Sequence, residues 1–438
     1  MGFDPSRRVA SPRDRASHLV VNLAMKRPRL IEAALEIARE AWAWGSGHPA
    51  VVLLALGTAA RLLGFFANRE YWLDEASLAS AIGDARLSDV FGPISSSQLA
   101  PVGFMAVERA IYRFLGDSRL ILRVLPLVGG LTSLWLFRGV AERCLSPRAA
   151  LLALAMFAIS DDLISFAAEL KPYATDVALA VLCTWLALSW EPLPWPTVWL
   201  ALGGTVAAWF SFPATFVLMG LGLVLAGSSI ARRDWHALRL LGLVGWIWSA
   251  SVAGVQWAVR TQLEDPHAMN VFWSFSFPDR PNTPTHLAEW AARSLAYLFA
   301  NPMDLYIPGV GWTVPALAGL GFFLWACGSM ARRDAKTFGL LVAPLGLALL
   351  AGSLRLYPCH GRLALFLVPA LILLIAEGAD RAAELIGGRA MWRLAFIWLA
   401  LLPASVALFH VIEPYATPQR NHHGDRRPFW LEPGQFLR

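Results

Sequence analysis

Two adjacent carboxylates flanked by aromatic residues are the sharpest chemical feature of the sequence, in the stretch Tyr71-Trp72-Leu73-Asp74-Glu75-Ala76-Ser77. They follow an apolar run at 49–66, and carboxylates at a membrane surface are costly unless they are paired or solvated. A desolvated carboxylate suits a general base for a hydroxyl or amine nucleophile. The structural alternative is that Asp74 and Glu75 favour the N-terminus of a helix through its macrodipole. The residues alone leave both interpretations open.

A second cluster is the stretch Glu169-Leu170-Lys171-Pro172-Tyr173. Here Lys171 could bind a phosphate or carboxylate, with Glu169 supporting that site. Alternatively, Lys171 extends from the membrane to the interface, and Pro172 only begins the next helix.

The third cluster is the stretch Arg355-Leu356-Tyr357-Pro358-Cys359-His360-Gly361-Arg362. Arginine presents a planar fork of donors that matches phosphate oxygens, so Arg355 and Arg362 suit a lipid phosphate headgroup. The alternative is ordinary interfacial anchoring beside Tyr357. Four further arginines follow the carboxylate pair, and we expect most of them at the surface: Arg109, Arg113, Arg119 and Arg123.

Composition shows which elements must position these clusters. Of 438 residues, 57% are hydrophobic and only 16% are charged, against roughly 25% charged residues in soluble domains. This balance excludes a soluble or disordered chain and predicts an all-α polytopic membrane protein. A membrane helix needs about 20 mostly apolar residues, and such runs predict about eleven spans. These are 49–66, 122–141, 148–166, 172–189, 197–212, 213–230, 239–259, 309–330, 337–354, 362–377 and 391–412.

The distribution of Lys and Arg predicts the orientation. Eight of them precede residue 40, and RR doublets recur in alternate connections, so the positive-inside rule places the N-terminus in the cytoplasm. Residues 1–48 then form a basic cytoplasmic segment with an interfacial amphipathic helix over 28–43. The transmembrane domain covers 49–412, and a polar extracytoplasmic tail covers 413–438.

This topology places all three clusters on the extracytoplasmic side of a plasma (inner) membrane. Two long outer segments, 67–121 and 260–308, lie on that side, and long loops usually carry function. In the second, Trp273, Phe275 and Phe277 are candidates for sugar stacking or for dipping into the membrane.

Other chemistries find little support in the sequence. The four cysteines are scattered without a CxxC motif, and no His, Asp or Cys set has metal-ligand spacing. We therefore expect no cofactor, although a divalent ion between Asp74 and a phosphate stays open. The net charge of +6 follows the membrane topology, so we expect no nucleic-acid partner.

Taken together, these segments resemble the C-type membrane glycosyltransferases related to protein O-mannosyltransferases and the lipid A aminoarabinose transferase. The resemblance is carried by LDEAS at 73–77, RLILRVLPLVGG at 119–130, ELKPY at 169–173 and YPCHGRLALFLVPALILLIAEG at 357–378. It covers roughly residues 50–380. It implies a first outer loop with juxtamembrane helices and an enzyme that transfers a sugar from a polyprenyl-phosphate donor. The acceptor would be an extracytoplasmic glycolipid, polysaccharide or protein.

The resemblance also implies roles for single residues. Asp74 matches the family's base, and Glu75 matches the second acid of its Asp-Glu pair. Glu169 and Lys171 match the acidic and basic positions of the second outer loop, with Tyr173 beside them. Arg362 matches an arginine implied to contact the donor phosphate.

The residue types are consistent with that reaction. A lipid phosphate is a good leaving group, so cations that stabilise it are sufficient, and Lys171 and Arg362 suit this task. Direct displacement at the anomeric carbon would invert its configuration. Two other hypotheses remain: a transporter or flippase for a lipid-linked sugar, which predicts ionisable residues deep inside spans, and a non-catalytic scaffold, which predicts that Asp74 and Lys171 point apart.

Overall fold

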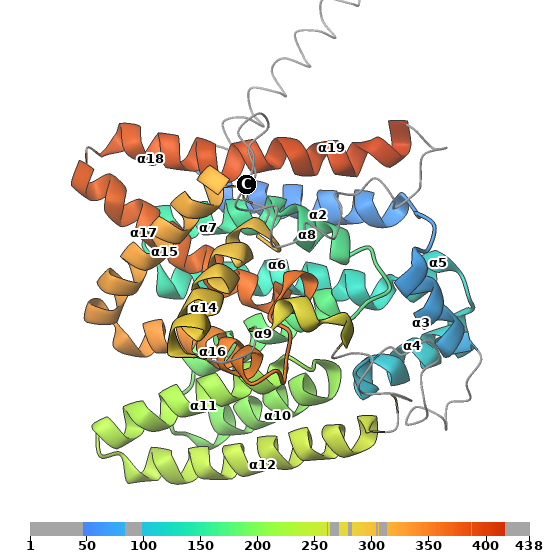
Figure 1. Cartoon of the computed structure of the whole chain (residues 1–438), viewed down its shortest axis with the longest axis horizontal. Helices are drawn as coiled ribbons and strands as arrows, with labels where there is room; N and C mark the ends of the chain where they lie inside the picture. Colours follow the sequence, from blue (N-terminus) through green and yellow to red (C-terminus); the bar gives the residue numbers. More distant parts are fainter. Residues whose placement is uncertain are drawn as a thin grey trace, which may run out of the picture. The chain divides into compact units, whose positions relative to one another are not determined.

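The computed structural model describes residues 47–83, 99–260, 262, 271–278, 283–303, 305, 313–386 and 388–416 (Figure 1). The chain divides into two compact units, Met1–Val52 and Leu53–Arg438. Only residues 47–52 of the first unit are described. The predicted amphipathic helix over 28–43 and the tail beyond residue 416 lie outside the described residues. The described secondary structure is helical and contains no strand.

Helices occupy all eleven places where the sequence predicts a span. Over the described chain, seven of them are long and apolar enough to cross a membrane. The protein is therefore an all-α, multi-pass membrane protein. The helices at the expected places are α2 (Pro49–Phe66), α6 (Val124–Cys144), α7 (Pro147–Ile159) with α8 (Asp161–Phe166), α9 (Tyr173–Leu188), α10 (Pro194–Phe210), α11 (Ala214–Ala231), α12 (Trp235–Val259), α15 (Thr313–Arg333), α16 (Ala335–Ser353), η3 (Gly361–Leu367) with α17 (Val368–Ile386), and α18 (Arg389–Phe396) with η4 (Ile397–Leu401) and α19 (Leu402–Ala416).

The third predicted span, 148–166, is divided into α7 and α8. A buried arginine forms hydrogen bonds to the backbone at this break. The last carbonyls of a helix lack an intrahelical partner, which is costly away from water. Arg61 of α2 donates from Nη1 to the carbonyl of Ala158 at 3.1 Å and from Nη2 to that of Phe157 at 3.3 Å. The chain can therefore end α7 and begin α8 without exposing bare carbonyls to lipid.

The fifth and sixth predicted spans, 197–212 and 213–230, are two separate helices, α10 and α11. Pro213 lacks a backbone N–H and cannot continue α10. Ser211 adopts an extended conformation, and its Oγ accepts from the Ala214 N–H at 3.2 Å at the start of α11. The sequence therefore predicts two helices here correctly.

The two long segments that the sequence predicts on the outer side, 67–121 and 260–308, contain further helices. In the first segment these are α3 (Leu73–Gly83), α4 (Val102–Leu115) and α5 (Arg119–Leu122), which lie together at one end of the helices (Figure 1). Leu78, Ile82, Phe104 and Met105 form their buried apolar cluster. The second outer segment contains η2 (Ser274–Ser276) and α14 (Pro284–Ala300).

Two glycines of α6 allow the chain that contains the second cluster to approach this helix closely. A Cβ on Gly130 would lie 2.5 Å from the Cβ of Ala167, and one on Gly129 would lie 3.0 Å from the Thr175 nitrogen. Such separations are shorter than packed side chains permit. The contact therefore sets the position of residues 167–175, which include Glu169 and Lys171.

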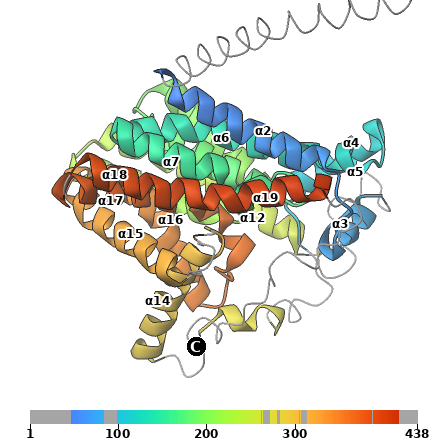
Figure 2. The same ribbon diagram turned by 90° about the horizontal axis from the view of Figure 1, so that it is seen from above.

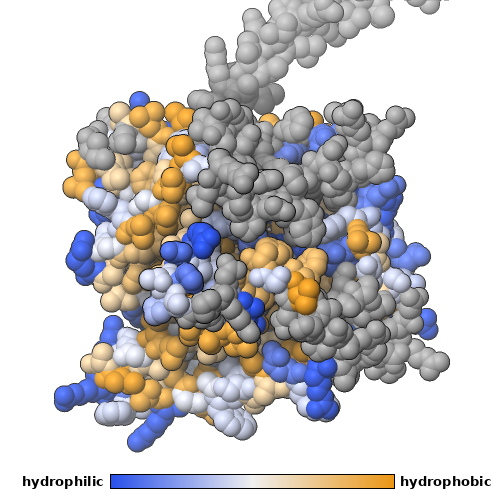
Figure 3. Space-filling model, viewed as in Figure 1, coloured by the Kyte–Doolittle hydropathy of each residue, from blue (hydrophilic) through white to orange (hydrophobic). Residues whose placement is uncertain are grey.

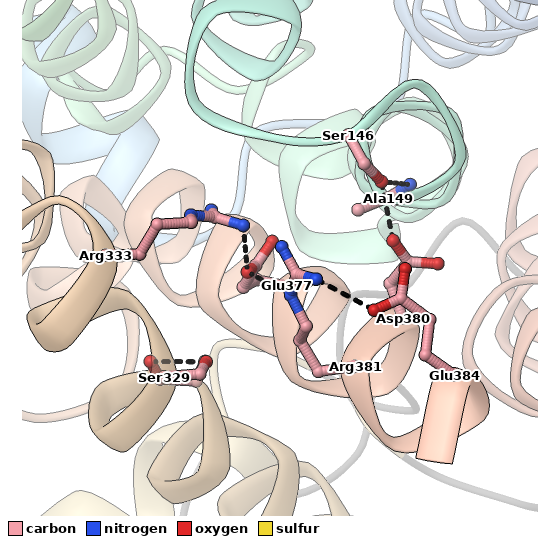
Figure 4. Close-up of polar contacts among 9 residues, drawn as sticks. Ser146, Ala149, Ser329, Arg333, Glu377, Asp380, Arg381 and Glu384 are labelled. Carbon is pink, nitrogen blue, oxygen red and sulfur yellow. Dashed lines mark hydrogen bonds and ion pairs between the residues drawn. The ribbon is translucent and has the colours of Figure 1, made fainter. Parts of the chain in front are cut away.

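An ion-pair cluster joins three helices at the end opposite α3 to α5 (Figure 4). Glu377 of α17 is buried and accepts from Arg333 of α15 and Arg381 of α17, both at 3.0 Å. One turn further along α17, Asp380 accepts from Ser146 Oγ at 2.5 Å, and Ser146 also caps α7. These contacts hold α7, α15 and α17 together far from the three predicted clusters.

Apolar side chains cover much of the exposed surface of the helices on the face drawn in Figure 3, with hydrophilic residues at its left and right edges. Among the exposed residues are Trp199 of α10, Leu223 of α11 and Trp246 of α12. Exposed apolar side chains along helix flanks are expected where lipid is the solvent.

Candidate functional site

Asp74 and Arg362 form an ion pair where α3 meets η3. Arg362 Nη2 lies 2.5 Å from Asp74 Oδ2, and Asp74 keeps 24% of its side chain exposed while Arg362 keeps 8%. The guanidinium carbon lies 5.2 Å from the ring centre of Trp72 and 5.6 Å from that of Tyr173. The two aromatic rings therefore orient Arg362, a favourable cation–π arrangement. The first and third predicted clusters thus meet in space.

The backbone around Gly361 aims Arg362 at this place. Gly361 has φ +52°, a left-handed conformation that favours glycine. The following 3₁₀ turn, η3, is buried, and Tyr357 Oη donates to the Leu363 carbonyl at 2.7 Å. The chain is thereby fixed on both sides of Arg362.

Glu75 has different surroundings from its neighbour Asp74. It is fully buried, and Arg123 donates to its two oxygens, from Nε to Oε1 at 3.0 Å and from Nη2 to Oε2 at 3.0 Å. The Leu170 N–H donates to Glu75 Oε1 at 2.8 Å. Arg123 also lies over the Tyr71 ring. Glu75 therefore ties α3 to the start of α6 and to the second cluster.

Glu169 and Lys171 lie in a tight turn before α9, in which the Lys171 N–H donates to the Glu169 carbonyl at 2.7 Å. Both side chains are buried. Burial lowers the pKa of Lys171 to about 8, although nearby Asp74 opposes this shift. Burial, reinforced by Glu75, raises the pKa of Glu169 to about 8, while Arg123 and Arg362 oppose the shift. The second cluster is thus within electrostatic reach of the other two.

Two predicted phosphate-binding residues have separate positions. Tyr173 is the first residue of α9; it lies against Arg362 and makes an edge contact with Phe166. In contrast, Arg355 donates from Nη2 to the Pro278 carbonyl at 2.6 Å. It anchors the second outer segment, whereas the ion-pair partner of Asp74 is Arg362.

Several charged residues are buried that the sequence did not single out as buried. The expectation of surface positions is wrong for Arg109 and Arg123, which are buried. Glu108 of α4 is fully buried as well, and burial raises its pKa to about 9. The clearest missed signal was Arg61, since an arginine inside an apolar run is costly unless it has partners. Because Arg123 precedes α6 and pairs only through the fold, no local pattern revealed it.

A small polar pocket lies behind Glu169, between α2, α8 and α19. It contains about 350 Å³ of empty space, counting its open mouth, and Arg69, Asp161, Glu169 and His410 line it. His410 Nδ1 lies 2.6 Å from Asp161 Oδ2, and Arg69 donates to the His410 carbonyl at 2.6 Å. That carbonyl needs a donor because Pro414, four residues on, has no N–H. Figure 2 shows α19 beside α7, and contacts join it to α8.

The aromatic residues of the second outer segment divide into two groups. Trp273 and Phe277 are buried, whereas Phe275 is 40% exposed and lies 5.2 Å from the His360 ring. His360 stacks on Tyr297 at 4.1 Å. Burial lowers the pKa of His360 to about 4, so this imidazole is neutral. Of the three predicted aromatic contacts, only Phe275 presents a large exposed surface.

The described residues contain no group of three or more His, Cys, Asp or Glu side chains that could hold a metal ion. The ionisable side chains near the Asp74–Arg362 pair include Glu169 and Lys171. A carboxylate beside two cations can bind an anionic group and accept a proton next to it.

Solved structures with the same arrangement of helices reveal what this chain is similar to. ArnT from Cupriavidus metallidurans in the apo state matches with a TM-score of 0.53 and 16% identity, over 85% of this chain and 66% of that chain. The archaeal oligosaccharyltransferase AglB from Archaeoglobus fulgidus matches with a TM-score of 0.53 and 11% identity, over 84% and 56%. The chain has the fold of ArnT and AglB. The resemblance expected from the sequence is therefore confirmed at the level of the fold.

Two of these structures contain a lipid phosphate. ArnT bound to undecaprenyl phosphate matches with a TM-score of 0.51 and 15% identity, over 84% of this chain and 72% of that chain. The AglB structure is a complex with an inhibitory peptide and a dolichol-phosphate. The chain spans about two thirds of the apo ArnT chain and just over half of AglB. No protein-family model and no curated protein sequence matches it.

Proposed function

We propose that this protein transfers a sugar from a polyprenyl-phosphate donor to an acceptor on the extracytoplasmic side of the membrane. The observation that carries the proposal is the meeting of Asp74, Arg362 and Lys171 at one end of the helices. These residues come from three distant parts of the sequence. Two structures with the same fold were solved with lipid phosphates, which favours this donor class.

The cations are assigned to the donor phosphate. Arg362 is held by Trp72 and Tyr173, and Lys171 is buried beside it. In a site of low dielectric, such charges stabilise the negative charge that builds up on the departing phosphate. Arg362 would exchange part of its contact with Asp74 for phosphate oxygens.

Asp74 is assigned as the general base. When the acceptor hydroxyl or amine attacks the anomeric carbon, the bond from that carbon to the phosphate oxygen breaks and its electron pair stays on the phosphate. The acceptor proton passes to Asp74, whose partly exposed side chain then releases it to water. A single displacement of this kind inverts the anomeric carbon.

The second acid, Glu75, is assigned a positioning role. Both of its oxygens accept hydrogen bonds from Arg123, and it has no exposed surface. A base must reach the proton that it removes, and Glu75 is instead occupied with holding α3 to the Glu169–Lys171 turn.

A transporter would need ionisable groups lining a path through the spans. Arg61 is an ionisable residue inside α2, but it donates to carbonyls at the end of α7. Arg61 thus completes a helix end, and the buried Glu377 of α17 pairs with Arg333 and Arg381. These two ionisable residues hold helices together, which favours the transferase over the transporter.

The test uses membranes that contain the full chain or its Asp74→Asn variant, supplied with radiolabelled polyprenyl-phosphate sugars. We expect the variant to lose about 10²- to 10⁴-fold in transfer, the usual contribution of a general base. Asp117→Asn, which alters an exposed acid before α5, is the control and should retain transfer. Undiminished transfer in Asp74→Asn would contradict the assigned base. Lipid translocation without transfer by the unmodified chain would favour the transporter.

A further inference from the structure

We propose that the sugar of the donor lipid stacks on the indole ring of Trp72, so that this residue selects a pyranose with an apolar C–H face. The inference rests on the proposed function, because it assumes that the donor phosphate binds at Arg362. It deepens that function by naming the part of the site that recognises the sugar and not the phosphate.

Trp72 lies where the proposed reaction requires the sugar. Its ring centre is 5.2 Å from the guanidinium carbon of Arg362, and Arg362 is paired with Asp74. In the proposed displacement, the anomeric carbon is bonded to a phosphate oxygen at Arg362. It is attacked by an acceptor whose proton passes to Asp74. The sugar ring therefore lies between these two residues, beside Trp72.

Exposure distinguishes Trp72 from the other aromatic ring at Arg362. Tyr173 also contacts the guanidinium, at 5.6 Å, but it is only 9% exposed and its ring makes an edge contact with Phe166. Trp72 is partly exposed, and so is Asp74. The open side of the ion pair is therefore the side of α3, where a bound sugar meets Trp72 and not Tyr173.

The indole ring suits the apolar face of a pyranose. The face of an aromatic ring is electronegative and attracts positively polarised groups. The C–H groups of a sugar ring are polarised in this sense by the neighbouring oxygens, and their burial against the indole removes apolar surface from water. Equatorial hydroxyl groups project from the rim of the sugar, so stacking leaves them able to form hydrogen bonds.

The backbone holds Trp72 in place before a sugar binds. Its carbonyl accepts the first hydrogen bond of α3, from the Ala76 N–H at 2.9 Å, and its own N–H donates to Glu75 Oε2 at 3.5 Å. Glu75 is held in turn by Arg123. A binding surface that is fixed in advance loses little conformational entropy when its ligand binds.

The exposed aromatic residue of the second outer segment is the competing candidate. Phe275 contacts the rings of His360 and Trp273, whereas Trp72 contacts the arginine that is assigned to the phosphate. The sugar is joined directly to that phosphate, so the contact with Arg362 favours Trp72.

The test compares binding of undecaprenyl phosphate with binding of undecaprenyl-phosphate glucose, mannose and galactose to the full chain in detergent. The dissociation constant of the tightest sugar lipid should rise about tenfold more in Trp72→Leu than that of undecaprenyl phosphate, because the sugar loses its apolar contact. Trp72→Phe keeps an aromatic face, and we expect this additional loss to be about threefold or less. Tyr173→Leu is the matched control, since it removes the other ring at Arg362 and should weaken both kinds of lipid by the same factor.

Equal losses for both kinds of lipid in Trp72→Leu would show that Trp72 only orients Arg362, and would overturn the inference. An unchanged affinity for the sugar lipid would overturn it as well. If the unmodified chain binds neither kind of lipid, the proposed function fails, and this inference fails with it. Equal losses in Trp72→Leu, with both lipids bound by the unmodified chain, would remove this inference alone.

A second measurement does not depend on the folding of Trp72→Leu. The chain contains 20 tryptophans, so ¹⁹F NMR of the chain labelled with 5-fluorotryptophan needs Trp72→Phe to assign the resonance of Trp72. We expect the sugar lipid to shift this resonance beyond the shift that undecaprenyl phosphate causes, because a stacked sugar changes the surroundings of the ring. Identical shifts with the two lipids would contradict stacking on Trp72.

Discussion

Adjacent residues on a helix point about 100° apart, and this explains why Asp74 and Glu75 have such different surroundings. Asp74 faces Arg362 at the partly exposed site, and Glu75 faces Arg123 in the interior. The same local sequence therefore supplies one group that can exchange protons with substrates and one that holds the fold.

The two acids should differ in their effects on stability. Removing one partner of a buried ion pair typically costs about 3–5 kcal/mol, because the other charge is left buried without compensation. We expect Glu75→Gln to lower the melting temperature by several degrees and Asp74→Asn to change it little. Thermal unfolding in detergent, followed by intrinsic tryptophan fluorescence, checks this. Equal melting temperatures for the two variants would show that the Glu75–Arg123 pair does not hold α3.

Binding of the lipid phosphate should depend on pH through Lys171. Burial lowers the pKa of this side chain to about 8, so its positive charge is present below pH 8 and is lost as the pH rises through that value. We expect the affinity for undecaprenyl phosphate to fall between pH 7 and pH 9. Lys171→Arg stays charged and should retain more of its affinity at pH 9. A pH profile identical in both proteins would exclude Lys171 from the phosphate site.

At the scale of elements, the site depends on how closely α6 approaches the chain before α9. That turn carries Glu169 and Lys171, and its neighbour Ala167 rests directly against Gly130. Glycines at a helix contact allow the two backbones to approach closely. Because protein interiors are densely packed, a side chain that does not fit at such a contact displaces its neighbours.

A single methyl group at this contact should therefore disturb the site. Gly130→Ala places a Cβ 2.5 Å from that of Ala167, and we expect at least about a tenfold loss of transfer, because small misplacements of catalytic groups are costly. Gly227→Ala in α11 is the matched control, since no atom lies within 4 Å of its Cβ. Transfer that is equally reduced, or equally retained, in both variants would contradict this role of the α6 contact.

For the whole molecule, the length of α12 agrees with the thickness of a membrane. Trp235 and Trp257 are both exposed, near opposite ends of this helix. At about 1.5 Å per residue, the distance between them is about 33 Å, close to the roughly 30 Å of a hydrocarbon core. Tryptophans are enriched at the two membrane interfaces.

The orientation that the basic connections predict can be tested by labelling both ends of the helices. Arg233 lies in the basic connection between α11 and α12. Leu356 lies between α16 and η3, on the side of the candidate site. We expect a membrane-impermeant maleimide to label Leu356→Cys in intact cells and Arg233→Cys only in inverted vesicles. Both positions are exposed. The native Cys144, Cys183 and Cys359 are buried, and Cys327, which is partly exposed, is replaced by Ser in both variants. Labelling of Arg233→Cys from outside would reverse the proposed topology.

Local patterns in the chain were sufficient for the places of the spans and for three candidate clusters. The reason is that lipid imposes its demands on continuous stretches of about 20 residues, which can be seen one segment at a time. The residue types of Asp74, Lys171 and Arg362 indicated their chemistry for a similar reason, because a charge next to an apolar run is costly unless it is paired or solvated.

Only the tertiary structure decided which charge pairs with which. Arg362 lies 288 positions after Asp74, and Arg123 lies 48 positions after Glu75, so no local pattern could assign these pairs. Burial decided the other differences between the site residues. Glu75 is buried whereas Asp74 is partly exposed, and burial lowers the pKa of Lys171 and raises that of Glu169. Desolvation depends on everything packed around a group, and therefore belongs to the folded molecule and not to any segment of its sequence.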